Sequence, residues 1–200
     1  MSVTPRDISS PRPIETGIYN GAFGITPLSG LCETEKNLAD HVTGYLSTWF
    51  TAVREVPGRH WTGKAMRLDA VLSPLDQESW RGSDPVHIGL EFKRHRGDFI
   101  RASAQAVDYA QSAWEGFGTL PVFICPGIAE CAQWWNASRS YAFACRFLGR
   151  FNVGELNYET QHGFTFRKSW SIVWAENPAP YWNGHCPNNA EIMQPKWGSR

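Results

Sequence analysis

The spacing of large apolar residues predicts a first helix from about Glu33 to Val53. At about 100° per residue, their side chains fall within one arc of the helical wheel that is roughly 100° wide. The arc contains Leu38, Val42, Tyr45, Leu46, Trp49 and Val53. Glu35 falls inside the same arc, whereas Glu33 falls on the far side. We therefore expect the carboxylate of Glu35 to point inward and that of Glu33 to face solvent.

Two segments after this helix alternate apolar and polar residues, a pattern typical of half-buried strands. They are residues 64–72 (KAMRLDAVL) and 86–93 (VHIGLEFK), joined by a long polar loop. The elements predicted after them are a helix from about Phe99 to Trp114, a buried strand over 120–125, a helix over about 129–136, strands near 142–147 and 153–158, and a last strand over 163–173. This order predicts an α/β fold with a central mixed β-sheet flanked by helices.

Both ends of the chain lack a clear apolar period and are rich in Pro, Gly and polar residues. We therefore expect an irregular N-terminal arm over 1–30, an α/β domain over 31–175 and an irregular C-terminal tail over 176–200. Five cysteines without a C-x-x-C pair favour a reducing compartment over a disulfide framework. The sequence has no apolar run of 18 residues and no apolar leader at its start, so we expect a cytoplasmic protein that makes no membrane contact.

Three charged residues, Asp69, Glu91 and Lys93, lie on the two alternating segments. Glu91 and Lys93 are two residues apart on one predicted strand, so their side chains project to one face. Two facing carboxylates repel one another, and Mg²⁺, which prefers oxygen ligands, removes that repulsion. Lys93 could then orient a water or stabilise charge on a phosphate, and Glu35 is a third carboxylate that could reach the same place. The alternative is an ordinary solvated face of the sheet.

At this point the chain resembles the PD-(D/E)XK nuclease superfamily. The resemblance rests on Glu35, Asp69 and Glu91-Phe92-Lys93, and it extends to about Cys125, nearly half of the chain. It implies a restriction-endonuclease-like core: a helix with a Glu, a hairpin with D…E-x-K, a helix, a further strand and usually another helix. One departure is that Leu68, not proline, precedes Asp69.

The resemblance also implies a role for each matching residue. Asp69 and Glu91 would bind Mg²⁺ or Mn²⁺ together with the carbonyl of Phe92, Lys93 would be the catalytic lysine, and Glu35 would be an auxiliary acid. The QAVDYAQ stretch (105–111) is similar to the Gln-and-Tyr helix of resolvase-like and exonuclease-like members.

Two groups of residues near these candidates could contact DNA. The window 93–101 (KRHRGDFIR) has four basic residues and one acidic residue, a net charge of +3 in a chain whose net charge is +0. On the second predicted helix, Arg101, Gln105 and Tyr109 form a polar stripe, which either faces solvent or lies over the metal site. We expect Arg94, Arg96, Arg101, Gln105 and Tyr109 to bind nucleic acid.

These patterns favour a metal-dependent nuclease that hydrolyses DNA phosphodiester bonds by in-line attack of a metal-activated water. Two alternatives stay open: a catalytically inactive nuclease fold that binds nucleic acid, and a protein-interaction module that uses its aromatic-rich tails. The sequence contains no helix-turn-helix or zinc-finger pattern, which favours structure-directed cleavage over recognition of a specific site. In a homodimer, the two metal sites could act on the two strands of a DNA duplex.

Overall fold

The computed structural model describes residues 25–26, 28, 32–77, 85–93, 99–128, 138–159, 162–169 and 171–177. Its helices are α1 (Glu35–Leu46), α2 (Phe99–Ala110) and α4 (Ser138–Arg150). Its strands are β1 (Ile25–Thr26), β2 (Phe50–Arg59), β3 (Ala65–Pro74), β4 (Ile88–Phe92), β5 (Ala113–Trp114), β6 (Val122–Cys125), β7 (Val153–Glu159), β8 (Gly163–Lys168) and β9 (Ser171–Ala175). Within these segments, no helix has the length and hydropathy needed to cross a membrane.

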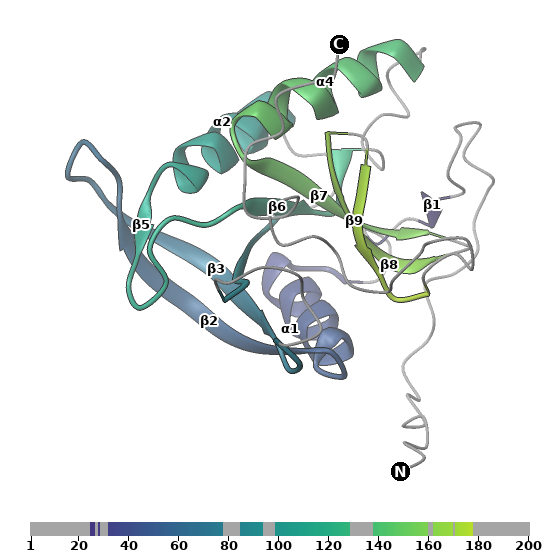
Figure 1. The fold of residues 1–200 in the computed structure, drawn as a ribbon, viewed down its shortest axis with the longest axis horizontal. Coiled ribbons are helices and arrows are strands. Elements are labelled where there is room, and N and C mark those ends of the chain that lie inside the picture. The colour runs from purple at the N-terminus through teal and green to yellow at the C-terminus, as the bar shows by residue number, and fades with distance from the viewer. Residues whose placement is uncertain are drawn as a thin grey trace.

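The strands form one open mixed sheet, as the sequence predicts, in the order β5-β2-β3-β4-β6-β7-β8-β9, with β1 paired to β7 outside this path. Strands β2, β3 and β4 are antiparallel neighbours, and β8 and β9 extend the other side in the same manner. Between them, β4, β6 and β7 run parallel. Figure 1 shows α2 and α4 together on one face of the sheet and α1 on the opposite face.

Each face of the sheet carries its own hydrophobic core. On the α1 face, Leu38 and Val42 of the helix pack in one cluster with Leu90 of β4. On the other face, Ala106 of α2 packs with Ile124 of β6 in a second cluster. Neighbouring residues of a strand point to opposite faces, and the acids of β4 and β7 (Glu91, Glu155 and Glu159) are all buried on one face or the other.

Helix α1 begins at Glu35, directly after an N-cap at Thr34, and ends earlier than the apolar arc predicts. The Thr34 hydroxyl accepts a hydrogen bond from the Asn37 amide at 3.1 Å, and this contact caps the first turn. The helix ends at Leu46, and the chain continues as β2, so the prediction of a helix as far as Val53 was wrong. The stretch after Phe50 is rich in β-branched residues, which favour a strand, and it pairs with β3 along its whole length.

Three further predictions need correction. Residues 142–147 belong to helix α4 and not to a strand, because Cys145 and Leu148 bury one helical face while Phe143 and Phe147 stay exposed. The predicted last strand is the hairpin of β8 and β9, and the second helix ends at Ala110, after which the chain forms β5. The helix predicted over about 129–136 lies outside the described residues.

Most of the two predicted arms also lies outside the described residues. Within the N-terminal arm, β1 pairs with β7 and Leu28 is fully buried in the core, so this part of the arm is not irregular. At the start of the predicted tail, Glu176 accepts hydrogen bonds from the Tyr45 hydroxyl at 2.7 Å and from the Phe164 amide at 3.1 Å. The Tyr45 contact ties the end of the β8–β9 hairpin to α1, and the Phe164 contact holds the same end against β8.

Candidate active site

The structure brings Asp69 and Glu91 together on neighbouring strands. The register of β3 and β4 pairs Ala70 with Leu90, and its extension by one residue sets Asp69 opposite Glu91. The Phe92 amide donates a hydrogen bond to Asp69 Oδ2 at 2.7 Å, which fixes this carboxylate across the two strands. Glu91 is 2% exposed. The two carboxylates therefore meet at a largely buried point on the sheet.

Lys93 and two residues of α2 complete a polar network around Glu91. The Lys93 ammonium forms an ion pair with Glu91 Oε1. Gln105 Nε2 donates to the same oxygen at 2.8 Å and contacts the Tyr109 hydroxyl at 2.8 Å. The other carboxylate oxygen, Glu91 Oε2, is buried and has no hydrogen-bond partner in the part of the chain that the structure describes. Gln105 and Tyr109 thus lie over the carboxylate pair, and Glu91 keeps one acceptor unused.

Burial controls the acidity of this pair. It raises the pKa of Glu91 to about 8, and the Asp69 charge acts in the same direction, while Lys93 opposes both. Burial also raises the pKa of Asp69, although the Phe92 amide and Lys93 lower it again. The pKa of Tyr109 is raised by its burial and by the Glu91 charge. Without a further positive charge, two ionised carboxylates in this position are costly.

Glu35 lies at the N-terminal end of α1, and its side chain is exposed, as is that of Glu33. The prediction that the Glu35 side chain points inward and is buried was therefore wrong. Glu35 is the first residue of the helix, and a position at the open end of a helix stays in contact with solvent even when its angular phase is apolar. Its charge nevertheless raises the pKa of both Asp69 and Glu91, so its carboxylate acts on the same site.

The remaining predicted residues take different positions. Arg101 is exposed on α2, while Arg94 and Arg96 lie outside the described residues. The Phe92 ring is buried in the core on the α1 face, and its amide reaches the site through Asp69.

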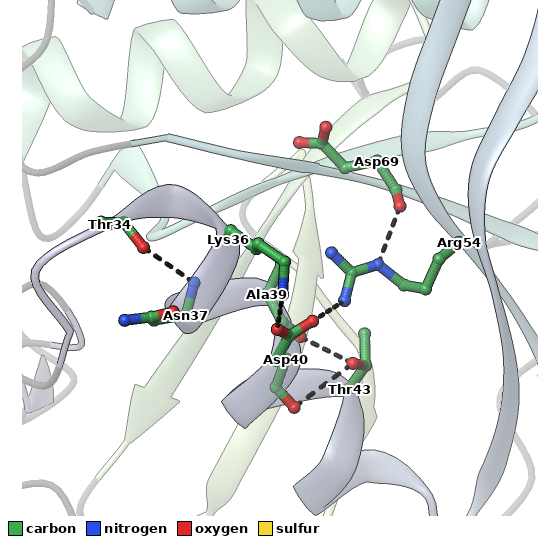
Figure 2. Close-up of polar contacts among 8 residues, drawn as sticks. All are labelled: Thr34, Lys36, Asn37, Ala39, Asp40, Thr43, Arg54 and Asp69. Atoms are coloured by element: carbon green, nitrogen blue, oxygen red, sulfur yellow. Dashed lines mark hydrogen bonds and ion pairs between the residues drawn. The ribbon is translucent and has the colours of Figure 1, made fainter.

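One residue that the sequence analysis did not single out, Arg54, supports the strand that carries Asp69. Its Nε donates to the Asp69 carbonyl at 3.0 Å, and one terminal nitrogen contacts Asp40 of α1 at 2.7 Å. Figure 2 shows the Asp69 carboxylate pointing away from this guanidinium, so Arg54 holds the backbone and leaves the carboxylate accessible to other groups. The prediction of a helix as far as Val53 hid this contact, because it left the adjacent strand β2 unrecognised.

The carboxylate pair fits a hard divalent cation. Mg²⁺ takes oxygen ligands, usually one or two carboxylates completed by water and substrate phosphate. Asp69 and Glu91 supply two such groups, and the buried Glu91 Oε2 is an acceptor without a partner among the described residues. The same residues contain no group of three or more His, Cys, Asp or Glu side chains that could hold a metal. Any cation here would therefore depend on water, backbone or substrate for the rest of its ligands.

A second buried polar cluster lies on β7 and β8. Arg167 forms an ion pair with Glu159 through two nitrogens, one of them 2.9 Å from Glu159 Oε2. Lys168 donates to the Asn152 side chain at 2.6 Å. Glu159, Arg167 and Lys168 are each at most 5% exposed. Because their charges are paired with protein groups, this cluster supports the fold rather than a ligand.

Comparison with known proteins gave no match, whether to a family model, to a curated protein or to a solved structure.

Proposed function

We propose that the protein is a metal-dependent nuclease that hydrolyses DNA phosphodiester bonds at the Asp69–Glu91 pair. The observation that carries the proposal is the meeting of the buried Glu91 carboxylate with the partly buried Asp69 carboxylate. Lys93 contacts Glu91, whose other oxygen is buried and has no hydrogen-bond partner among the described residues. Two neighbouring strands that bring two acids out of solvent beside a lysine, at a cost in desolvation, are typical of a functional site.

The order of the elements supports the same proposal. Helix α1 precedes the β3–β4 hairpin that carries both acids, and α2, β6 and α4 follow it. This is the order that the resemblance to PD-(D/E)XK nucleases implies for a restriction-endonuclease-like core. Strand β4 also runs parallel to β6, so the end of β4, where Lys93 lies, opens at the same edge of the sheet as the end of β6.

The residues of the site divide the work between them. Asp69 and Glu91 would hold Mg²⁺ or Mn²⁺, and the Phe92 carbonyl at the end of β4 is a third candidate ligand. When bound, the cation would supply an activated water and stabilise negative charge on the phosphate. The Lys93 side chain lies against Glu91, where it would stabilise charge that develops on the phosphate. Gln105 orients the Glu91 carboxylate.

A cleavage assay with matched variants tests the proposal. Linear, circular, branched and single-stranded DNA are incubated with the protein in Mg²⁺, in Mn²⁺ and in EDTA. We expect cleavage that depends on the cation and is lost in Asp69→Asn, while Asp108→Asn, at an exposed position of α2, cleaves as the wild type does. Wild-type activity in Asp69→Asn would refute the assignment.

The assay separates the roles of the two glutamates as well. As the auxiliary acid that the resemblance implies, Glu35 would add negative charge that attracts the cation, so Glu35→Gln should slow cleavage. Glu33→Gln, at a neighbouring exposed position, should leave the rate unchanged. Equal effects of the two substitutions would remove Glu35 from the site.

A second candidate function is a catalytically inactive nuclease fold that binds nucleic acid. The observation in its favour is that Lys93 and Gln105 already satisfy Glu91 Oε1, so the network is partly self-sufficient without a cation. Binding of DNA with no cleavage in Mg²⁺ or Mn²⁺, and no increase in melting temperature with either cation, would favour this function.

A further inference from the structure

The hairpin of β2 and β3 extends beyond the strand that carries Glu91. Its two strands pair out to Arg59 and Ala65, while β4 pairs with β3 from Ala70 to Leu72. At about 3.4 Å per residue, the part between Asp69 and the turn is roughly 14 Å long. Figure 1 shows this turn at the far left of the molecule. We call residues 56–68 the finger.

The surface of the finger combines one exposed aromatic ring with positive charge. Trp61, in the turn, is 75% exposed, and the His60 ring lies 5.2 Å from it, centroid to centroid. The sequence of the finger (VPGRHWTGKAMRL) contains Arg59, Lys64 and Arg67 and no acidic residue. Arg67 forms an ion pair with Glu55, just before the finger, at 2.7 Å, so the positive charge of the tip comes from Arg59 and Lys64. Basic side chains of this kind bind phosphate.

The finger is held firmly at its tip and at its base. In the turn, the His60 amide donates to the Lys64 carbonyl at 2.9 Å and the Gly63 amide donates to the His60 carbonyl at 2.8 Å. At the base, the Trp114 ring packs so closely on Gly58 that a Cβ there would lie 2.3 Å from a ring atom. A rigid finger loses little conformational entropy when it binds a partner.

The base of the finger is also connected to the carboxylate site. Trp114 Nε1 donates to the Tyr109 carbonyl at 3.1 Å, and the Tyr109 side chain belongs to the network around Glu91. Through Trp114 and Tyr109, the base of the finger therefore contacts the network of the proposed cleavage site.

We propose that the finger binds DNA at a junction between duplex and single strand, with Trp61 stacked on an unpaired base and Arg59 and Lys64 on the phosphates. This inference rests on the proposed function and names the form of its substrate. An indole can stack only on a base whose face is free, and a continuous duplex has no free base face. An exposed tryptophan beside basic residues therefore fits a fork or a frayed end.

Binding to two DNA forms in EDTA tests the finger without cleavage. The forms are a forked duplex with 2-aminopurine at the junction and a relaxed circular duplex, which has no ends. Trp61→Ala should weaken fork binding by about 5- to 150-fold, the range of one lost base–aromatic stack, and abolish quenching of the 2-aminopurine. Its affinity for the circle should stay within about twofold of the wild type, and Trp61→Phe should retain most of the fork affinity.

Two further variants test the details. Lys64→Ala should weaken binding to both forms. The slope of log affinity against log salt concentration should become shallower by about 1. Phe143→Ala, at a 70% exposed aromatic residue of α4, is the control and should bind the fork as the wild type does. The inference is overturned if Trp61→Ala binds the fork with wild-type affinity, as expected for a finger that docks on a protein. It is also overturned if the variant loses affinity for the fork and the circle equally.

The outcomes also distinguish this inference from the proposed function. Cation-dependent cleavage by the wild type together with an unaffected Trp61→Ala would leave the nuclease proposal standing and refute the finger. Fork binding that depends on Trp61, without any cleavage, would do the reverse. Absence of DNA binding would refute both.

Discussion

Replacement of Glu91 by glutamine should change the way in which stability depends on pH. Glutamine keeps the shape of the side chain and removes its ionisable proton. In the wild type, burial raises the pKa of Glu91 from 4.5 to about 8. Between these two values the folded protein retains a proton that the unfolded chain has lost. The free energy of unfolding should therefore fall as pH rises through this window.

The size of the effect follows from the separation of the two pKa values. At 1.36 kcal/mol per pKa unit, a separation from 4.5 to about 8 corresponds to a loss of roughly 5 kcal/mol for the wild type. The raised pKa of Asp69 acts in the same direction. Burial lowers the pKa of His87, which adds the opposite slope near its ordinary value, but this contribution is shared by the wild type and the variant.

Urea unfolding followed by tryptophan fluorescence at pH 5, 6, 7 and 8 in EDTA measures this slope. We expect the stability of the wild type to fall across the series and that of Glu91→Gln to fall much less, so that the variant becomes the more stable protein near pH 8. Glu115→Gln, at an exposed position, should follow the wild type. Parallel curves for the wild type and Glu91→Gln would show that burial does not raise the pKa of Glu91 in the folded protein.

Two further substitutions test the packing around the site and the second polar cluster. Gly58→Ala should lower the free energy of unfolding by about 1–3 kcal/mol, because its Cβ would meet the Trp114 ring at 2.3 Å; wild-type stability in urea unfolding would contradict the close packing at the base of the finger. Glu159→Ala should lower the free energy of unfolding by about 3–5 kcal/mol, because it breaks a buried ion pair with Arg167, and an unchanged urea midpoint would show that the pair does not form in solution.

Local periodicity was sufficient to find most of the carboxylate network. Alternation along two strands put Asp69 and Glu91 in corresponding positions, and the two-residue spacing put Lys93 on the same face as Glu91. The helical spacing of four residues put Gln105 and Tyr109 on one side of α2. In the structure, the two sets of residues meet at Glu91. Both patterns could be read from the sequence because they belong to short elements whose geometry depends little on the rest of the chain.

Long-range contacts account for what periodicity missed. Trp49 and Val53 fall in the apolar arc of the first helix, but the helix ends at Leu46. Pairing with β3 decides that the chain from Phe50 onward becomes β2, and no local pattern records that partner. The support that Arg54 gives to Asp69 was hidden for the same reason. The exposure of Glu35 depends on where the helix starts, which a helical wheel does not contain.

The most direct test of the nuclease proposal is single-turnover cleavage at saturating DNA in Mg²⁺, comparing the wild type with Lys93→Ala and Lys93→Arg. Lys93 contacts Glu91 and is not part of a hydrophobic core, so Lys93→Ala should remain folded. We expect Lys93→Ala to cleave at least about 100-fold more slowly than the wild type, with Lys93→Arg between the two, and with DNA affinity largely retained. Cleavage by Lys93→Ala at the wild-type rate, or no cleavage by the wild type itself, would contradict the assignment of this site to phosphodiester hydrolysis.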